Sequence, residues 1–493
     1  MKLHLIDVLA IVLYLLGITW FGLRFRHGQR SLRSYFLADR NVPWWAISLS
    51  IVSAETSTLT IISIPGLAYT GDFGFLQIAI GYLLGRIVIC VLFLPRYFEG
   101  QLMTAYQLIG ERFGKALHRF TAGLFLGTRA AAEGVRIFAV SIVIAVAFGT
   151  GTIPSIIILT ILTLIYTFEG GFAAVIWTDV IQMLLYFAGT ILALWTLGTK
   201  VPGGWAVIHH TAAAGHKFTV FHFALSLTQT YTFWGGLIGG CFLTMASHGT
   251  EQLVVQRLLA AKNLVQSQVA LLASGVIVFI QFALFLLIGA GLYVFYPAGT
   301  LAHIGTADRL FPLFIVQDMP HGISGLVIAA ILAAAMSNMS AALNSLSSTT
   351  MVDFYLPRHP EMDERARTRL SRILTAVWAV VLLVLAVLSR TGGHVVEIGL
   401  SIASVTWGEM LGAFLLGTLT RRANQTGTII GMIIGLIVNL ILWQQPGPFA
   451  VGHVWGLPKV AFIWYVLIGA LITTSIGYVA SLLLPKQERA VAA

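Results

Sequence analysis

The chain has 493 residues, of which 58% are hydrophobic and only 10% are charged, and its mean hydropathy is +0.89. So few charges cannot cover the surface of a soluble protein of this size. Apolar stretches of about 20 residues, the length that spans a bilayer as a helix, recur from end to end and leave room only for short loops. The composition predicts an all-α integral membrane protein without a separate soluble domain.

Charge and cysteine usage exclude several other classes. The net charge is +10, but the basic residues are spread along short loops and form no stripe interleaved with aromatic residues, so no nucleic-acid partner is expected. Cys90 and Cys241 both lie in apolar stretches, which excludes a disulfide framework and a cysteine zinc site. The sequence has no H-E-x-x-H pair, nucleophile elbow or phosphate-binding G-x-x-x-x-G-K loop, so we expect no enzyme.

Hydropathy predicts about thirteen membrane-spanning segments. They are 4–23, 43–70, 74–97, 117–148, 153–169, 171–197, 228–249, 264–295, 322–346, 370–389, 395–418, 424–444 and 460–484. Most of the 29 lysines and arginines fall in alternate loops, beginning with the basic cluster that follows the first segment. Because cytoplasmic loops carry the excess of positive charge, we expect a multi-pass protein of the cell membrane with its N-terminus outside and its C-terminus cytoplasmic. The first segment is then a retained helix and not a signal peptide.

The second segment is unusually polar for a membrane helix. A helix that only anchors the chain has no reason to carry a carboxylate and many hydroxyl groups. Its polar residues are Ser48, Ser50, Ser53, Glu55, Thr56, Ser57, Thr58, Thr60 and Ser63, followed by Pro65-Gly66. The pattern predicts a broken helix whose freed carbonyls and hydroxyls coordinate a monovalent cation. The alternative is a hydroxyl-lined packing face against a neighbouring helix.

Segment 228–249 repeats this irregularity five segments later, with threonines and the glycine pairs Gly235-Gly236 and Gly239-Gly240. Two interrupted segments, each at the head of a five-segment group, indicate an inverted repeat around a binding site at the membrane midplane. The predicted organisation is an N-terminal helix and loop, a first repeat, an extracellular connection, a second repeat and two C-terminal helices with a tail. These units cover 1–42, 43–197, 198–227, 228–418 and 419–493.

The ninth segment combines small residues with side-chain oxygens between 333 and 345. Ser337, Ser340, Ala341 and Asn344 share one helical stripe by their three- and four-residue spacing. Such a stripe can line a cation site, although small residues also serve close helix packing.

Ionisable residues inside spans are functional candidates because each is costly in the bilayer. Arg129, Glu133 and Arg136 share one helical face, which leaves one positive charge uncompensated within that helix. Either Glu55 or a substrate carboxylate is expected to compensate this positive charge, since a guanidinium suits bidentate carboxylate binding. The alternative is a structural ion-pair network, with Arg129 as its structural member. Asp179 is a candidate cation relay or a capping and pairing group.

Five ordered motifs over nearly the whole chain carry a resemblance to a known family. They are 34–45, 104–114, 170–182, 250–263 and 333–355, the last ending Val352-Asp353-Phe354-Tyr355. Together they resemble the sodium/solute symporter family, which includes sodium-coupled carriers of sugars, proline, sialic acid, iodide, monocarboxylates and vitamins. Glu251 departs from the motif, where the family usually has aspartate.

The resemblance implies the leucine-transporter fold, with two five-helix inverted repeats, one helix before them and two after. It implies a main sodium site formed by Ser53, Thr56, Ala334, Ser337 and Asn338. The family has a hydroxyl where Asn338 stands, and we expect the amide to supply a carbonyl oxygen instead. Asp179 and Ser340 match a second cation site or release path found in some members, but Ala341 lacks the hydroxyl of that site, so one coupled sodium is expected.

For the substrate, Arg136 matches the position that holds the substrate carboxylate in the sialic acid carriers, and Ser57 and Thr60 match their polar contacts. Glu55 departs from those carriers, which have a hydroxyl there. We also expect Phe75 and Gln77 to contact the substrate. The resemblance to sugar carriers is weaker, because Leu400, Ser401 and Ala403 replace expected polar residues.

The sequence therefore predicts a sodium-coupled symporter that imports a small polar organic solute, with a carboxylate-bearing substrate favoured. The alternatives are a neutral sugar derivative, a polyol or a zwitterion as substrate, or proton coupling through Glu55 or Asp179. The expected partners are the solute, sodium and the lipid bilayer; no obligate protein partner is inferred.

Overall fold

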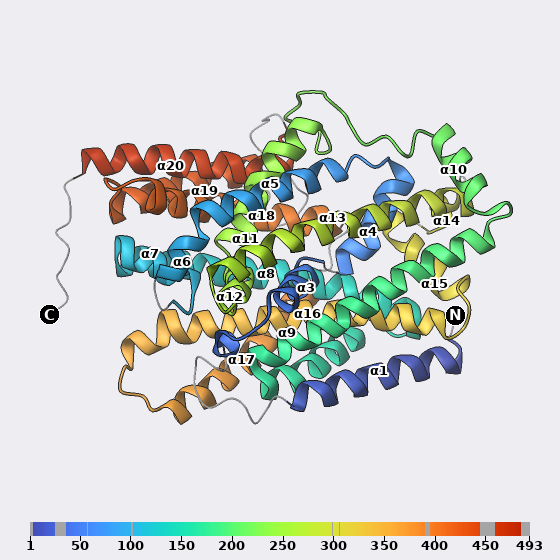
Figure 1. The fold of residues 1–493 in the computed structure, drawn as a ribbon, viewed down its shortest axis with the longest axis horizontal. Helices are drawn as coiled ribbons and strands as arrows, with labels where there is room; N and C mark the ends of the chain where they lie inside the picture. The colour runs from blue at the N-terminus through green and yellow to red at the C-terminus, as the bar shows by residue number, and fades with distance from the viewer. Residues whose placement is uncertain are drawn as a thin grey trace.

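The computed structural model describes residues 3–24, 36–56, 58–99, 102–297, 299–304, 306–389, 395–443 and 459–484. Throughout these residues the named secondary structure is helical, and the long helices run side by side along one direction of the molecule (Figure 1). Nine helices of the described chain are long and apolar enough to cross a membrane, or ten if a bent pair is one span.

The helices follow the apolar segments closely. Their bounds are α1 Leu5–Leu23, α3 Trp44–Glu55, α4 Thr58–Thr70, α5 Leu76–Leu92, α6 Leu94–Glu99, α7 Ala105–Phe113, α8 Lys115–Phe148, α9 Thr152–Lys200, α10 Gly204–Ala214, α11 Gly240–Gly249, α12 Gln252–Leu259, α13 Leu264–Phe295, α14 Thr300–Ile304, α15 Leu310–Gln317, α16 Ile323–Thr349, α17 Glu364–Leu388, α18 Val395–Leu419, α19 Gln425–Leu442 and α20 Tyr465–Leu483. Helix α9 runs without interruption over the two expected segments 153–169 and 171–197.

The predicted break in the second segment is confirmed. Helix α3 ends at Glu55, and Thr56 has extended backbone angles (φ −81°, ψ 98°). The stretches Trp44–Glu55 and Thr60–Thr70 are bent by 63° from each other. Pro65 lies inside helix α4 and does not make the break. A proline is tolerated in a membrane helix where neighbouring groups satisfy the freed backbone. The break lies among the polar residues that precede it.

The second interrupted helix is broken after its glycine pairs, not at them. The pairs form a π-helical turn, η3 (Gly235–Gly239), which continues directly into α11. Helix α11 ends at Gly249, and α12 begins at Gln252 after an extended Glu251. Both breaks therefore have a glutamate beside them or within them, Glu55 in the first helix and Glu251 in the second.

Glycines permit a very close contact between α5 and the second interrupted helix. A Cβ atom on Gly81 of α5 would lie 2.1 Å from the carbonyl oxygen of Gly236 in η3, which is far inside van der Waals contact. Gly236 in turn faces the backbone of Gln77, where a Cβ atom would lie 2.5 Å from the carbonyl carbon. The glycine pairs of the second interrupted helix thus serve backbone packing against α5.

The first helix is attached to the core by a buried carboxylate. Helix α1 packs against α9 and α16 at one edge of the molecule (Figure 1). Asp7 accepts hydrogen bonds from the backbone N–H groups of Gly322 at 2.6 Å and Gly325 at 3.0 Å, at the start of α16. A carboxylate at the N-terminus of a helix satisfies donors that have no partner within the helix. Helix α16, which carries the predicted cation stripe, is thereby held in place and packs against α3, α8 and α9.

Candidate ion and substrate site

Helices α3 and α16 meet at the break of the first interrupted helix. The side-chain amide nitrogen of Asn338 donates to the backbone carbonyls of Ser53 at 3.2 Å and Thr56 at 3.1 Å. The Ser53 hydroxyl lies 2.9 Å from the Ser337 hydroxyl. Ser337 donates its single hydroxyl proton to Asp179, so Ser53 is the donor of the serine pair. The predicted sodium ligands Ser53, Thr56, Ser337 and Asn338 are therefore neighbours.

The two backbone carbonyls orient the side chain of Asn338, and its expected role as an oxygen ligand of a cation stays a prediction. The sequence suggested that Asn338 would offer a carbonyl oxygen to a cation, but it is the amide nitrogen that faces the two backbone carbonyls. Both partners are acceptors only, so they select the NH₂ end of the side chain. The carbonyls of Ser53 and Thr56 and the hydroxyl of Ser337 are oxygens that suit sodium, and the amide group now bridges two of them.

Asp179 is buried and is held by three groups. It accepts hydrogen bonds from the hydroxyls of Ser50 and Ser337 and forms an ion pair with Arg257 of α12 at 2.9 Å. Arg257 also donates to the Ser50 carbonyl at 3.2 Å and to its hydroxyl at 2.8 Å. Asp179 therefore links α3, α9, α12 and α16 through these contacts, and its role as a cation relay stays a prediction.

A cavity of about 90 Å³ lies beside these residues. Its polar lining includes Glu55, Thr60, Arg129, Arg136, His248 and Glu251. Apolar and aromatic side chains, among them Phe75, Tyr82 and Phe282, complete the wall. Phe75 is fixed edge-to-face against Phe282, with ring centroids 5.1 Å apart. A small apolar chamber with a few charged groups is the usual form of a small-molecule site.

Glu55 pairs with Arg86, which the sequence analysis left without a role. The Arg86 guanidinium contacts the Glu55 carboxylate and lies 3.1 Å from Nε2 of His248, and His248 is 3.3 Å from the same carboxylate. Glu55 is thus paired with Arg86 and does not compensate the charge of Arg136, which was one of the two alternatives for that charge. The sequence contained a usable signal, because an arginine inside an apolar span requires an anion nearby.

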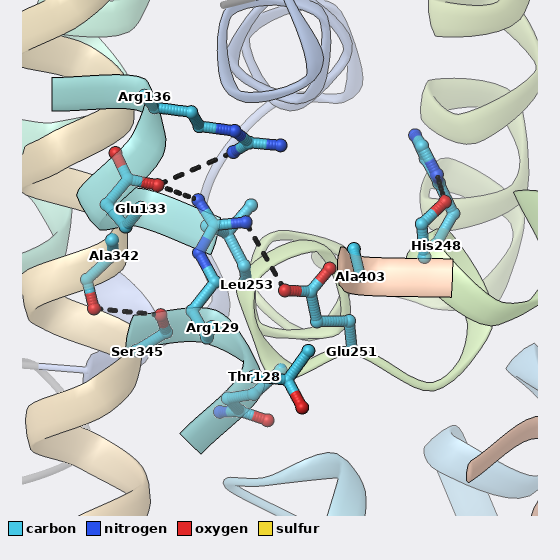
Figure 2. A network of polar contacts seen from close by, with 12 residues as sticks. Thr128, Arg129, Glu133, Arg136, His248, Glu251, Leu253, Ala342, Ser345 and Ala403 are labelled. Atoms are coloured by element: carbon cyan, nitrogen blue, oxygen red, sulfur yellow. Dashed lines mark hydrogen bonds and ion pairs between the residues drawn. The ribbon is translucent and has the colours of Figure 1, made fainter. Parts of the chain in front are cut away.

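The face formed by Arg129, Glu133 and Arg136 is completed by Glu251. Figure 2 shows the Glu133 carboxylate reached by both guanidiniums, Arg129 at 2.7 Å and Arg136 at 3.5 Å. On its other side, Arg129 reaches Glu251 at 3.3 Å. The positive charge that seemed uncompensated within the helix therefore meets a second carboxylate from the break before α12. Arg129 has the structural position, with its side chain 3% exposed, and Arg136 is 17% exposed.

The remaining predicted residues are placed less uniformly. Gln77 does not line the cavity; its amide accepts from the backbone of His222 at 2.9 Å and donates to Gly74 at 3.1 Å, so it fastens the loop before η3. Thr56 donates its hydroxyl to Gln281 of α13 at 2.6 Å. Ser340 is buried on α16. Ser57 lies outside the described residues, and so does the side chain of Ala334.

Two broken helices that enclose a central cavity, with freed backbone carbonyls at one break, define a secondary transporter. The sodium:solute symporter family model matches residues 35–435. The sodium/sialic acid symporter SiaT of Proteus mirabilis is 30% identical over 435 residues, which cover 85% of this chain and 86% of that protein. The human sodium/iodide cotransporter is 27% identical over 84% of this chain and 65% of its own length.

A solved structure agrees with the sequence matches. The substrate-bound outward-open state of a Na⁺-coupled sialic acid symporter superimposes with a TM-score of 0.85 at 28% identity, covering 98% of this chain and 99% of that one. The chain belongs to the sodium:solute symporter family. It has the leucine-transporter fold, it is a multi-pass membrane transporter and not an enzyme, and its coupling cation is sodium.

Proposed function

We propose that this protein imports a small carboxylate-bearing solute together with sodium, and that Arg136 binds the carboxylate. The observation that carries the proposal is the contrast between the two arginines of α8. Arg129 is buried between Glu133 and Glu251, whereas Arg136 lines the cavity, is partly exposed and contacts Glu133 only at 3.5 Å. Glu133 is already bound more closely by Arg129, so Arg136 has donors left for an anion in the cavity.

The names of the relatives support an anionic substrate. The two related carriers are named for sialic acid, which is a carboxylic acid, and for iodide, which is an anion. In this chain the aromatic wall around Phe75 would cover the apolar part of a solute, and Thr60 would meet its hydroxyl groups. The substrate's carboxylate would complete the coordination of Arg136 in place of water.

Transport follows from differential binding to two states. Sodium held by the carbonyls of Ser53 and Thr56 and the hydroxyl of Ser337 would join α3 to α16 and shape the adjoining cavity for the solute. The empty and fully loaded carrier then changes state readily, and the partly loaded carrier does so poorly. With the proposed orientation, N-terminus outside and C-terminus cytoplasmic in the cell membrane, an inside-negative potential adds about 2.3 kcal/mol per charge per 100 mV.

A specific observation favours a second class of substrate. Of the charged residues described at the cavity and its supporting network, Arg86, Arg129 and Arg136 are matched in number by Glu55, Glu133 and Glu251. A site without net charge suits a zwitterion, a polyol or a neutral sugar derivative. In that case Arg136 belongs to the network and Glu55 faces the solute.

Uptake into proteoliposomes tests the proposal. The purified protein is reconstituted, an inward sodium gradient is imposed, and carboxylates, sugar acids, amino acids and neutral sugars are offered in turn. The proposal expects accumulation of a carboxylate only when the sodium gradient is present. Accumulation of neutral or zwitterionic solutes alone would select the second class, and equal accumulation without a sodium gradient would contradict sodium coupling in this chain.

A further inference from the structure

The amide group of Asn338 contacts the same two backbone carbonyls that the proposed site would offer to a cation. Its nitrogen lies 3.2 Å from the Ser53 carbonyl and 3.1 Å from the Thr56 carbonyl. The residue is buried, as are Ser53, Thr56 and Ser337 around it. An NH₂ group has two protons and can serve both carbonyls at once, which is what a coordinated cation does with its positive charge.

A hydroxyl at position 338 would behave differently. Serine has one proton, so it can donate to one carbonyl at most, and its oxygen can also face a cation as a neutral ligand. The asparagine amide carries a hydrogen-bond donor, NH₂, and a possible cation ligand, the carbonyl oxygen, on the same group. With NH₂ toward α3 it replaces a cation, and with the oxygen turned toward α3 it repels the two carbonyls unless a cation lies between them.

The charge of the neighbouring Asp179 is compensated by another residue and is not freely available to attract a cation. Asp179 receives the Ser337 hydroxyl, but its charge is already opposed by the guanidinium of Arg257 at 2.9 Å. Arg257 also donates to Ser50 on α3, one turn before Ser53. A cation that enters the site is therefore attracted only weakly by Asp179. The contacts of Arg257 with Ser50 and Asp179 also connect α3 to the core without any ion.

We propose that Asn338 is a built-in substitute for the coupling ion, and that sodium must turn this amide before it can bind. In this proposal the NH₂ group joins α3 to α16 across the break whenever sodium is not bound. When sodium enters, the amide rotates, releases the carbonyls of Ser53 and Thr56 to the ion and presents its own oxygen. The inference rests on the sodium site in the proposed function and extends it.

Two consequences follow from this competition. The site binds sodium more weakly than it would with a hydroxyl at position 338, because the ion must first break two buried hydrogen bonds. The sodium-free protein is also more stable than it would be with a hydroxyl, because the amide keeps the two helices together. The change in stability on adding sodium is therefore small in the natural protein.

Thermal melting of the purified protein tests the inference directly, since a ligand that binds only the folded state raises the melting temperature. Sodium chloride is titrated against choline chloride at constant ionic strength, with no solute present. The variants are Asn338→Ser, which removes the bridge, and Asn338→Asp, which keeps the shape and replaces both donors by acceptors. Asn344→Ser is the matched control, because Asn344 is a buried asparagine on the same helix that bonds Gln256 and not α3.

The expected result has two parts. Without sodium, both Asn338 variants melt below the natural protein. With sodium they are stabilised more than the natural protein, and the half-maximal sodium concentration falls by about threefold or more in Asn338→Ser and about tenfold in Asn338→Asp, since 1.4 kcal/mol changes an affinity tenfold. Asn344→Ser keeps the natural half-maximal concentration.

Opposite results would overturn the inference. An unchanged or weaker sodium response in Asn338→Ser, while the natural protein is stabilised by sodium, shows that the amide does not compete with the ion. If neither the natural protein nor any variant responds to sodium, the sodium site itself is misplaced and the proposed function fails with it. A sodium response that appears only in the Asn338 variants supports the inference that the amide takes the place of sodium.

Discussion

Arg86 of α5 holds the carboxylate of Glu55 at the last residue of α3, directly before the first break. The arginine is fully buried and also lies 3.1 Å from His248 on α11. One guanidinium thus joins both interrupted helices to α5. The positive charge of Arg86 compensates the Glu55 carboxylate, which is costly to bury in a membrane-spanning helix.

The Arg86–Glu55 pair predicts a strong effect of removing only one partner. Arg86→Met leaves Glu55 charged in a buried site and should lower the free energy of unfolding by about 3–5 kcal/mol. The double variant Arg86→Met/Glu55→Leu should recover most of this loss, because a well-packed apolar pair carries no desolvation cost. Melting temperatures of the four proteins complete the cycle. Additive losses in the double variant would show that the two residues do not interact.

The two arginines of α8 should separate into a binding and a structural residue. Arg136→Ala is expected to raise the KM for a carboxylate solute by about 10- to 100-fold, the equivalent of one lost charged hydrogen-bond pair, with little change in the melting temperature without solute. Arg129→Ala should mainly lower that melting temperature, because it leaves Glu133 and Glu251 without their shared cation. Solute-dependent melting and uptake kinetics measure both. Equal destabilisation by the two substitutions would place Arg136 in the structural network.

The hydroxyl of Ser337 should contribute to the sodium requirement. Ser337→Ala removes one oxygen from the proposed site and the link between Ser53 and Asp179, so more sodium should be needed for half-maximal uptake. Ser345→Ala is the control: Ser345 is equally buried on α16 but donates only to the carbonyl of Ala342 in its own helix at 3.0 Å (Figure 2). Uptake is measured against sodium at fixed ionic strength. An unchanged sodium dependence in Ser337→Ala would remove this residue from the site.

Proton coupling should not replace sodium coupling. A proton on Asp179 would leave Arg257 buried without its counter-charge, and a proton on Glu55 would do the same to Arg86. Uncompensated buried charges are strongly unfavourable. We therefore expect an inward proton gradient in sodium-free buffer to drive no accumulation of solute in proteoliposomes. Accumulation under that condition would show that one of these pairs opens during transport.

The contact between α5 and η3 should tolerate no side chain. Gly81→Ala would place a methyl group 2.1 Å from the carbonyl oxygen of Gly236, so we expect a large loss of folded protein. Gly127→Ala in α8 meets nothing within 4 Å and replaces a poor helix former by a good one, so its stability should stay the same or rise by up to about 1 kcal/mol. Size-exclusion profiles and melting temperatures compare the two. A well-folded Gly81→Ala protein would contradict the close approach.

The sequence by itself determined the membrane class and most helix positions, because apolar segments of bilayer length have no other stable structure. The span 264–295 coincides with α13, and the polar second segment was correctly expected to break. The count of thirteen spans, the orientation and the five-part organisation stay predictions. The membrane class and the helix positions were predictable because each depends on residues close together in the chain.

Only the tertiary structure decided which charges meet and which end of an amide faces a carbonyl. Arg86 and Glu55 are 31 residues apart, Asp179 and Arg257 are 78 apart, and Arg129 and Glu251 are 122 apart. The sequence supplied these residues but could not assign partners, since each arginine had several carboxylates to choose from. The sequence predicts an oxygen ligand at Asn338, and only the structure shows that its amide nitrogen faces the backbone carbonyls of Ser53 and Thr56.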